Sequence, residues 1–363
     1  MGVLRFILAI AVVVYHSYKI FGLKMCGGQV AVESFYIISG FYMALVLNEK
    51  YLGDGSYKKF ILSRLYRIFP VYWLVLLATV LFSVIGYYAF NKPYFLYRYV
   101  SPNQCLSGVT LFYFLLENLI VIGQDALYFL KIDNYCQPGF VYDVFSYNHT
   151  GYQYLFVPQA WSISIELMFY LIAPFLVTKK IKWQIAVILL SVTAKVYFGL
   201  NHYLYFDPWS YRFFPFELGH FMAGSLAYQM YTRIKNKELS DIIAYLFLAF
   251  SVAVIFFFKS FSTNDYLYSA VFYVVFAAGL PFIFKSFKNN RFDRTIGELS
   301  FSIYIVHLLV VSLYRPFFLQ EITLVKYYGY AVVITSLLIA LGLHYTVVIP
   351  LEKWRQKKII EKS

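Results

Sequence analysis

The chain has 363 residues, of which 61% are hydrophobic, 22% are aromatic and only 13% are charged. A soluble domain cannot hide that share of apolar side chains from water, so the composition excludes a soluble globular protein and predicts an all-α, polytopic membrane protein. The formal net charge of +13 fits nucleic-acid or anionic-lipid binding as well as a membrane topology signal, so the positions of the charges decide its meaning.

Ten apolar stretches have about the length that a membrane-crossing helix requires. They fall at residues 3–22, 30–47, 68–90, 156–177, 183–200, 212–232, 240–259, 267–287, 296–314 and 328–349. With the N-terminus inside, the predicted cytoplasmic segments hold 21 of the 31 Lys and Arg residues, as the positive-inside rule requires. The excess charge is therefore a topology signal. We expect both termini in the cytoplasm, the lipid bilayer as a partner and no nucleic-acid partner.

Residues 91–155 form the one long connection, which this topology puts on the outer side. Within it, the stretch from Val109 to Leu130 is apolar enough to resemble a span. A span there would put the later basic runs KKIK and RIKNK outside, so we interpret the stretch as a re-entrant or surface helix. If the outer side is oxidising, Cys105 and Cys136 would pair and leave Cys26 free. We expect one transmembrane domain over 1–350 and a short basic cytoplasmic tail over 351–363.

The first predicted helix, Leu4 to Ser17, is apolar except for Arg5 near one end and His16 near the other. Eleven residues at about 100° each bring the two side chains to the same helix face, about 16 Å apart along the axis. Ionisable groups at membrane depth are functional candidates, although a polar residue satisfied inside a helix bundle is an equal alternative.

Two further ionisable residues are expected at the depth of His16. Glu166 and His307 each lie roughly ten residues into their predicted helices, which puts all three groups in the middle or outer half of the membrane. Two imidazoles and a carboxylate at one level suit general acid–base chemistry. The same groups would also suit a proton relay in a transporter.

Basic residues gather where the third predicted helix enters from the cytoplasm. Arg64 and Arg67 lie one helical turn apart there, at the level of Arg5. Arginine forks bind phosphates well, so we predict a phosphate-rich ligand at this mouth, with ordinary positive-inside anchoring as the alternative. Glu217 and His220 are three residues apart and would suit a metal, but such a pair more often satisfies itself, and we expect no metal.

These residues resemble the acyltransferase family 3 integral-membrane proteins, which acylate hydroxyl groups of sugars and other exported acceptors. The likeness runs through five motifs in order, from Arg5 to His307. They are Arg5…His16, AVESFYIISGF (31–41, containing Glu33), Arg64…Arg67, WSISIELMFYLIAP (161–174, containing Trp161, Ser162, Ser164 and Glu166) and IGELSFSIYIVH (296–307, containing Tyr304 and His307). The chain departs from the family pattern at Glu33, where Asp is usual, and at Leu167 and Met168, where Glu and Gln are frequent.

The resemblance implies ten helices, an acyl-CoA donor, most often acetyl-CoA, that enters from the cytoplasm, and a hydroxyl acceptor such as a cell-envelope carbohydrate met near the outer side of a bacterial inner membrane. Arg5, Arg64 and Arg67 would bind the CoA phosphates. His16 would act as general base or acyl carrier, with Glu166 orienting or charging it. Pocket positions would fall to Glu33, Trp161, Ser162, Ser164, Tyr304 and His307.

A transporter or flippase for a lipid-linked sugar is the main alternative, because it would use the same buried charges without covalent chemistry. Broken helices in two matching halves would favour it, and the sequence has no such internal symmetry. A purely structural membrane subunit is a further alternative, but it would not require five motifs of basic, imidazole and carboxylate groups.

Overall fold

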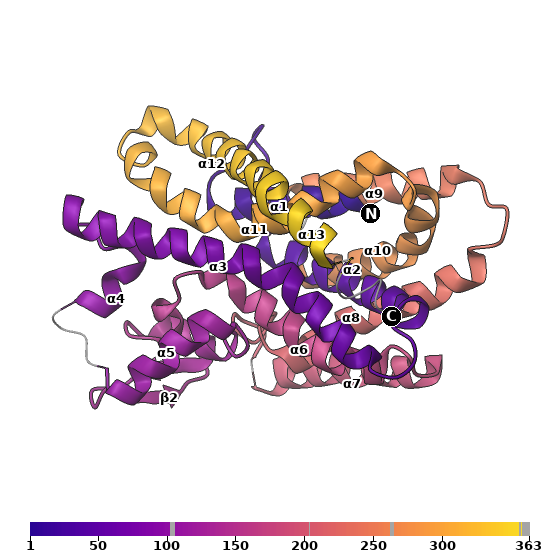
Figure 1. The fold of residues 1–363 in the computed structure, drawn as a ribbon, viewed down its shortest axis with the longest axis horizontal. Helices are drawn as coiled ribbons and strands as arrows, with labels where there is room; N and C mark the ends of the chain where they lie inside the picture. Colours follow the sequence, from indigo (N-terminus) through magenta and orange to yellow (C-terminus); the bar gives the residue numbers. More distant parts are fainter. Residues whose placement is uncertain (102–105, 203, 262–264, 356, 358–363) are drawn as a thin grey trace.

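The structure is a computed structural model that describes residues 1–101, 106–202, 204–261, 265–355 and 357. A helix appears at every one of the ten predicted stretches (Figure 1). These helices are α1 (Gly2–His16), α2 (Gly27–Glu49), α3 (Ser56–Phe90), α6 (Trp161–Leu176), α7 (Ile181–His202), α8 (Phe214–Ile234), α9 (Asp241–Phe261), α10 (Asp265–Phe287), α11 (Arg291–Phe318) and α12 (Ile322–Leu343). Within the described ranges, eight helices are long and apolar enough to cross a membrane. The prediction of an all-α polytopic membrane protein is confirmed.

The helix α1 is shorter than its predicted stretch. Its 15 residues rise only about 22 Å, less than the roughly 30 Å of a bilayer core. The helix ends at His16, so this side chain lies on the last turn rather than deep within a longer span.

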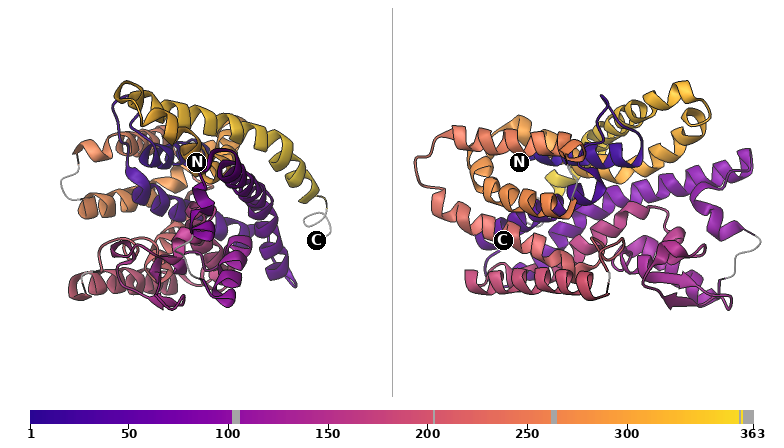
Figure 2. Two further views of the ribbon diagram at one scale, coloured as in Figure 1. Left: turned by 90° about the vertical axis from the view of Figure 1, so that its left-hand side faces the viewer. Right: turned by 180° about the vertical axis from the view of Figure 1, so that it is seen from behind.

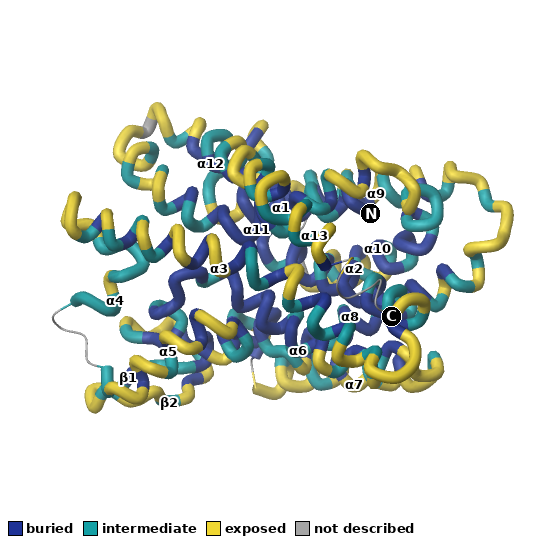
Figure 3. Tube along the Cα trace, viewed as in Figure 1, coloured by how far each residue is buried: buried dark blue, intermediate teal, exposed yellow. Residues whose placement is uncertain are grey.

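The helices divide into a buried centre and an outer ring. In the apolar 18-residue stretch of α2, 72% is buried inside the protein, whereas in the corresponding stretch of α7 only 17% is buried. Figure 2 shows α12 on one side of the molecule and α7 on the opposite side, with α1 and α2 between them. The exposed positions follow the outer helices (Figure 3), and many of them are large apolar residues. A ring of this kind suits contact with lipid.

Close packing against α11 fixes the position of α1. The Asp293 carboxylate of α11 accepts hydrogen bonds from the backbone N–H groups of Gly2 (2.8 Å) and Val3 (2.9 Å), which satisfies amides that the helix itself leaves unpaired. A Cβ added at Gly297 would lie 2.6 Å from the Cα of Gly2, so only glycine allows this crossing. The N-terminal end of α1 is therefore held against α11.

The long connection, which the sequence predicts to lie on the outer side, folds into a small layer of short elements that we call the outer layer. They are η1 (Tyr94–Leu96), α4 (Tyr97–Val100), α5 (Gly108–Ile120), η2 (Ala126–Phe129), the antiparallel pair β1 (Leu130–Ile132) and β2 (Pro138–Phe140), η3 (Val144–Ser146), η4 (Gly151–Tyr154) and η5 (Pro158–Ala160). The 13 residues of α5 are too few to span a membrane, in agreement with the interpretation of this stretch as a re-entrant or surface helix. Cys26 is free and buried, while the predicted Cys105–Cys136 bond involves Cys105, which lies outside the described residues.

The C-terminal end differs from the predicted tail. After α12 the chain continues through a π-helical turn (His344–Val348) into α13 (Ile349–Arg355). Arg355 is buried and donates to the Ser63 carbonyl (3.1 Å) and hydroxyl (3.0 Å). The first residues after 350 thus pack on α3 because Arg355 finds acceptors there, and the rest of the predicted tail, apart from residue 357, lies outside the described residues.

Candidate functional site

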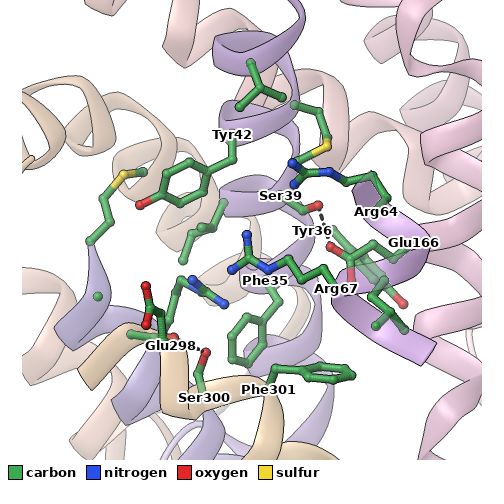
Figure 4. A pocket seen from close by; sticks show the side chains of 18 of the residues that line it. Phe35, Tyr36, Ser39, Tyr42, Arg64, Arg67, Glu166, Glu298, Ser300 and Phe301 are labelled. Atoms are coloured by element: carbon green, nitrogen blue, oxygen red, sulfur yellow. Dashed lines mark hydrogen bonds between the residues drawn. The ribbon is translucent and has the colours of Figure 1, made fainter. Parts of the chain in front are cut away.

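A basic cavity of about 400 Å³ opens among the ends of α1, α2, α3, α6 and α11 nearest the two chain termini. The structure brings the predicted trio Arg5, Arg64 and Arg67 together on its walls. In Figure 4, Arg67 reaches into the middle of the cavity and Arg64 lies on the wall beside Ser39. The cavity is lined by seven basic side chains (Arg5, Lys50, Arg64, Arg67, Lys288, Arg294 and Arg355) and three carboxylates (Glu166, Asp293 and Glu298). Its field therefore favours an anion.

Glu166 belongs to this basic cavity. Its carboxylate accepts hydrogen bonds from the hydroxyls of Ser39 (2.6 Å) and Tyr170 (2.5 Å). The structure does not bring it to His16, because the two residues line different cavities. Glu166 and His16 lie at different depths. The helix α6 begins at Trp161, and Glu166 lies more than one turn into it, whereas His16 is the last residue of α1. The predicted contact between these two side chains is thus corrected.

A second, smaller cavity of about 60 Å³ lies at the outer end of α1. His16 and Trp161 line it, together with Arg212 and Tyr128. The imidazole of His307 lies against that of His16, with 5.1 Å between ring centroids. The sequence predicts only a similar depth for the two histidines, and the structure adds that their rings are in contact.

The hydrogen bonding of His307 fixes which nitrogen carries its proton. Nδ1 lies 2.5 Å from the Tyr304 carbonyl oxygen, which can only accept, so Nδ1 is the donor. In the neutral ring Nε2 is then an acceptor, and it has no hydrogen-bond partner within the protein. His307 is fully buried, and its ring lies against that of His16. The free lone pair of Nε2 therefore belongs to a ring that contacts His16.

Tyr304 and Val32 line both cavities and so form the wall between them. The Tyr304 and Ser162 hydroxyls bond each other at 2.6 Å, and both lie within hydrogen-bonding distance of the Gln159 carbonyl oxygen. Ser162 faces the basic cavity and its neighbour Trp161 faces the outer one. The first turn of α6, Tyr304 and Val32 thus separate the basic cavity from the outer cavity.

Comparison with known protein families now bears on this pair of cavities. The family model described as "Acyltransferase domain", of the acyltransferase 3 type, matches residues 1–349. The chain belongs to this acyltransferase family. Comparisons with curated proteins and with solved structures find no match. The match spans every helix from α1 to α12, so both cavities of this membrane acyltransferase lie within the family domain.

Three predicted pocket residues of the acyltransferase, Glu33, Ser164 and His307, line neither cavity. Glu33 is 1% exposed and forms a salt bridge at 3.0 Å with Lys195, which also bridges Glu217 at 2.9 Å. Ser164 donates to Asp125 (2.6 Å) and so fastens the outer layer to α6. Glu33 faces α7 and α8 rather than a cavity because its compensating charge comes from those helices.

The Nδ1 of His220 lies 3.1 Å from the Oε2 of Glu217, although neither of these two atoms makes a hydrogen bond within the protein. Together with Glu33 these residues offer three potential metal-ligand atoms within 4.8 Å of one another. The Lys195 ammonium already donates to both carboxylates, so the cluster carries its own cation. This arrangement fits charge compensation better than metal binding.

Sequence reasoning missed Arg212 and Lys195. Lys195 lies in the apolar interior of α7, far from Lys182 in its first turn, and a cation in that position was a usable signal. Arg212 looks like an ordinary loop residue in the sequence, and only the fold brings it to His16.

Proposed function

We propose that this acyltransferase moves an acyl group, most often acetyl, from cytoplasmic acyl-CoA to a hydroxyl of a cell-envelope or exported carbohydrate, in a bacterial inner membrane. One observation carries the proposal: α1 has Arg5 in the basic cavity and His16 in the outer cavity. The helical rise between them is about 16 Å. That length suits a donor whose phosphates stay on the cytoplasmic side while its thioester reaches outward.

The basic cavity has the groups that CoA phosphates need. Arg64 is 6% exposed, and its Nε has no hydrogen-bond partner within the protein, so a buried donor is available to a ligand. Arg5 and Arg67 line the same space and supply further forks. Glu166 holds Ser39 and Tyr170 beside them and thereby shapes the wall of this donor site.

In the proposed reaction, His16 takes the proton of the acceptor hydroxyl as its oxygen attacks the thioester carbonyl carbon. The carbon–sulfur bond then breaks, and the leaving thiolate receives the proton, which yields the ester and free CoA thiol. In the alternative route, an imidazole nitrogen of His16 attacks first and carries the acyl group until the acceptor oxygen takes it. The unpartnered Nε2 of His307 would orient His16 in either route.

Radiolabelled acetyl-CoA added to inverted membrane vesicles, which retain the native acceptor inside, tests the proposal. His16→Ala should lower ester formation by about 10²- to 10⁴-fold, because the general base is lost. CoA binding should stay unchanged, since His16 does not line the basic cavity. His202→Ala, at the end of α7, is the matched control and should retain full activity. Full activity of His16→Ala at normal abundance would contradict the assignment.

The same assay distinguishes the transporter alternative. A flippase would move its sugar without releasing CoA thiol, whereas acyl transfer releases one thiol for each ester formed. Membership of the acyltransferase family favours the second outcome.

A further inference from the structure

Arg212 lies between α7 and α8 and is held from several sides. Its Nε and Nη2 atoms donate to the two carboxylate oxygens of Asp207, at 2.6 and 2.9 Å. Its guanidinium carbon lies 4.2 Å from the ring centroids of Tyr128 and Trp161, and 4.7 Å from that of Tyr211. Bidentate pairing and three aromatic contacts leave the guanidinium one orientation.

One nitrogen of this guanidinium is unused. Arg212 as a whole is only 9% exposed, and its Nη1 is buried without a hydrogen-bond partner within the protein. A charged donor left unpaired in this way is unfavourable, so a ligand oxygen that accepts from it would be bound favourably. Arg212 lines the outer cavity together with His16, so an oxygen that enters this cavity would lie close to both the guanidinium and the imidazole.

The size of the outer cavity limits which oxygen this is. Its volume of about 60 Å³ corresponds to about two waters, at roughly 30 Å³ each. The cavity is therefore too small to enclose a sugar ring, and only the few atoms that react would enter it. The cavity is therefore matched to the reacting atoms rather than to the body of the acceptor.

We propose that Arg212 is a catalytic residue whose Nη1 stabilises the oxyanion formed on the acyl carbonyl. This inference rests on the proposed acyl transfer. When the hydroxyl oxygen bonds to the carbonyl carbon, the carbonyl π electrons move to its oxygen, and Nη1 donates a hydrogen bond to the resulting negative charge. The charge returns as the carbon–sulfur bond breaks. A donor already fixed by Asp207 and three rings needs no reorganisation at that moment.

Substitutions at Arg212, tested with acetyl-CoA in the inverted-vesicle assay, distinguish catalysis from packing. Arg212→Gln and Arg212→Lys should lower kcat by about 10²- to 10³-fold, because each lacks the oriented fork. The KM for acetyl-CoA and the Kd for CoA should stay within about twofold of wild type, because the basic cavity is separate. Arg98→Gln, at an arginine of the outer layer that donates to a backbone carbonyl, is the matched control and should retain wild-type kinetics.

Asp207→Asn provides a second variant that keeps the arginine. It weakens the ion pair that aims Nη1, so kcat should fall by about tenfold while the Kd for CoA is unchanged. Wild-type kcat in Arg212→Lys, or a loss confined to protein abundance and CoA affinity, would overturn the role of Arg212 and leave the proposed function standing. Absence of thiol release from acetyl-CoA in the wild-type protein would remove both proposals.

Discussion

The buried ion cluster around Lys195 gives a prediction that is independent of the chemistry. Lys195→Met would remove the ammonium that bridges Glu33 and Glu217, whose side chains are 1% and 0% exposed. Both carboxylates would then be buried without a cation: Glu33 would keep the hydrogen bonds from Gln29 and Tyr273, and Glu217 would keep His220 at 3.1 Å. The substitution should therefore destabilise the helix bundle strongly.

The magnitude follows from the cost of breaking a buried pair, which is about 3–5 kcal/mol. The Lys195 side chain is 28% exposed, so water screens part of its interaction and the lower end of that range, about 3 kcal/mol, applies. In a Glu33→Gln background one carboxylate is already neutral, and the remaining Glu217 keeps His220. Loss of Lys195 should then cost about 1–2 kcal/mol less than in the wild type, because the two sites couple.

Thermal unfolding of the purified protein in detergent, followed by loss of the monodisperse species, provides the assay. The melting temperature should be lowest for Lys195→Met and partly recovered in Lys195→Met/Glu33→Gln. Lys182→Met, an exposed position on the same helix, controls for loss of a lysine from α7. Equal melting temperatures for wild type and Lys195→Met, or strict additivity of the two substitutions, would refute the electrostatic reasoning.

Two more predictions concern pH and packing. Burial raises the pKa of Asp125 in the outer layer to about 6, above its ordinary value near 4, so folding favours its protonated form. This stabilising contribution is complete below about pH 4 and is lost as the pH rises through 6, and Asp125→Asn should flatten that part of a melting-temperature profile. Gly40→Ala should abolish accumulation in the membrane, because the new Cβ would lie 1.8 Å from a backbone carbonyl of α8. At Gly342 an added Cβ meets no atom within 4 Å, so Gly342→Ala should instead stabilise α12 by about 0.5–1 kcal/mol. A quantitative immunoblot of membranes measures the abundance of both variants. More Gly40→Ala than Gly342→Ala protein would contradict the close contact between α2 and α8.

The helices of this fold are predictable because each is a long apolar run between charged or turn residues. Their boundaries are less so. The helix α3 starts at Ser56, twelve residues before the predicted span at 68–90. Its first turns are helical but polar, so a search for apolar stretches does not include them. Hydropathy detects the part of a helix that meets lipid, whereas the backbone hydrogen bonds continue into the cytoplasmic layer.

The candidate site is predictable where depth and membrane side are enough to define a position. Arg5, Arg64 and Arg67 meet because all three belong at the cytoplasmic edge. The partner of a buried carboxylate, in contrast, depends on how helices rotate against one another, and the sequence does not contain that rotation. Glu166 therefore binds Ser39 and Tyr170, and Arg212 reaches His16 through a turn whose path only the fold defines.

The wall formed by Tyr304 and Val32 has an electrical consequence. Cavities that admit water carry the potential of the adjoining solution inward, so most of the membrane voltage falls across this thin partition. Each unit charge that passes the full drop gains or loses about 2.3 kcal/mol per 100 mV. Under the proposed function, phosphates bound at the arginines would stay below the drop, and only an uncharged thioester arm would enter it. Turnover would then be insensitive to the resting potential of the cell.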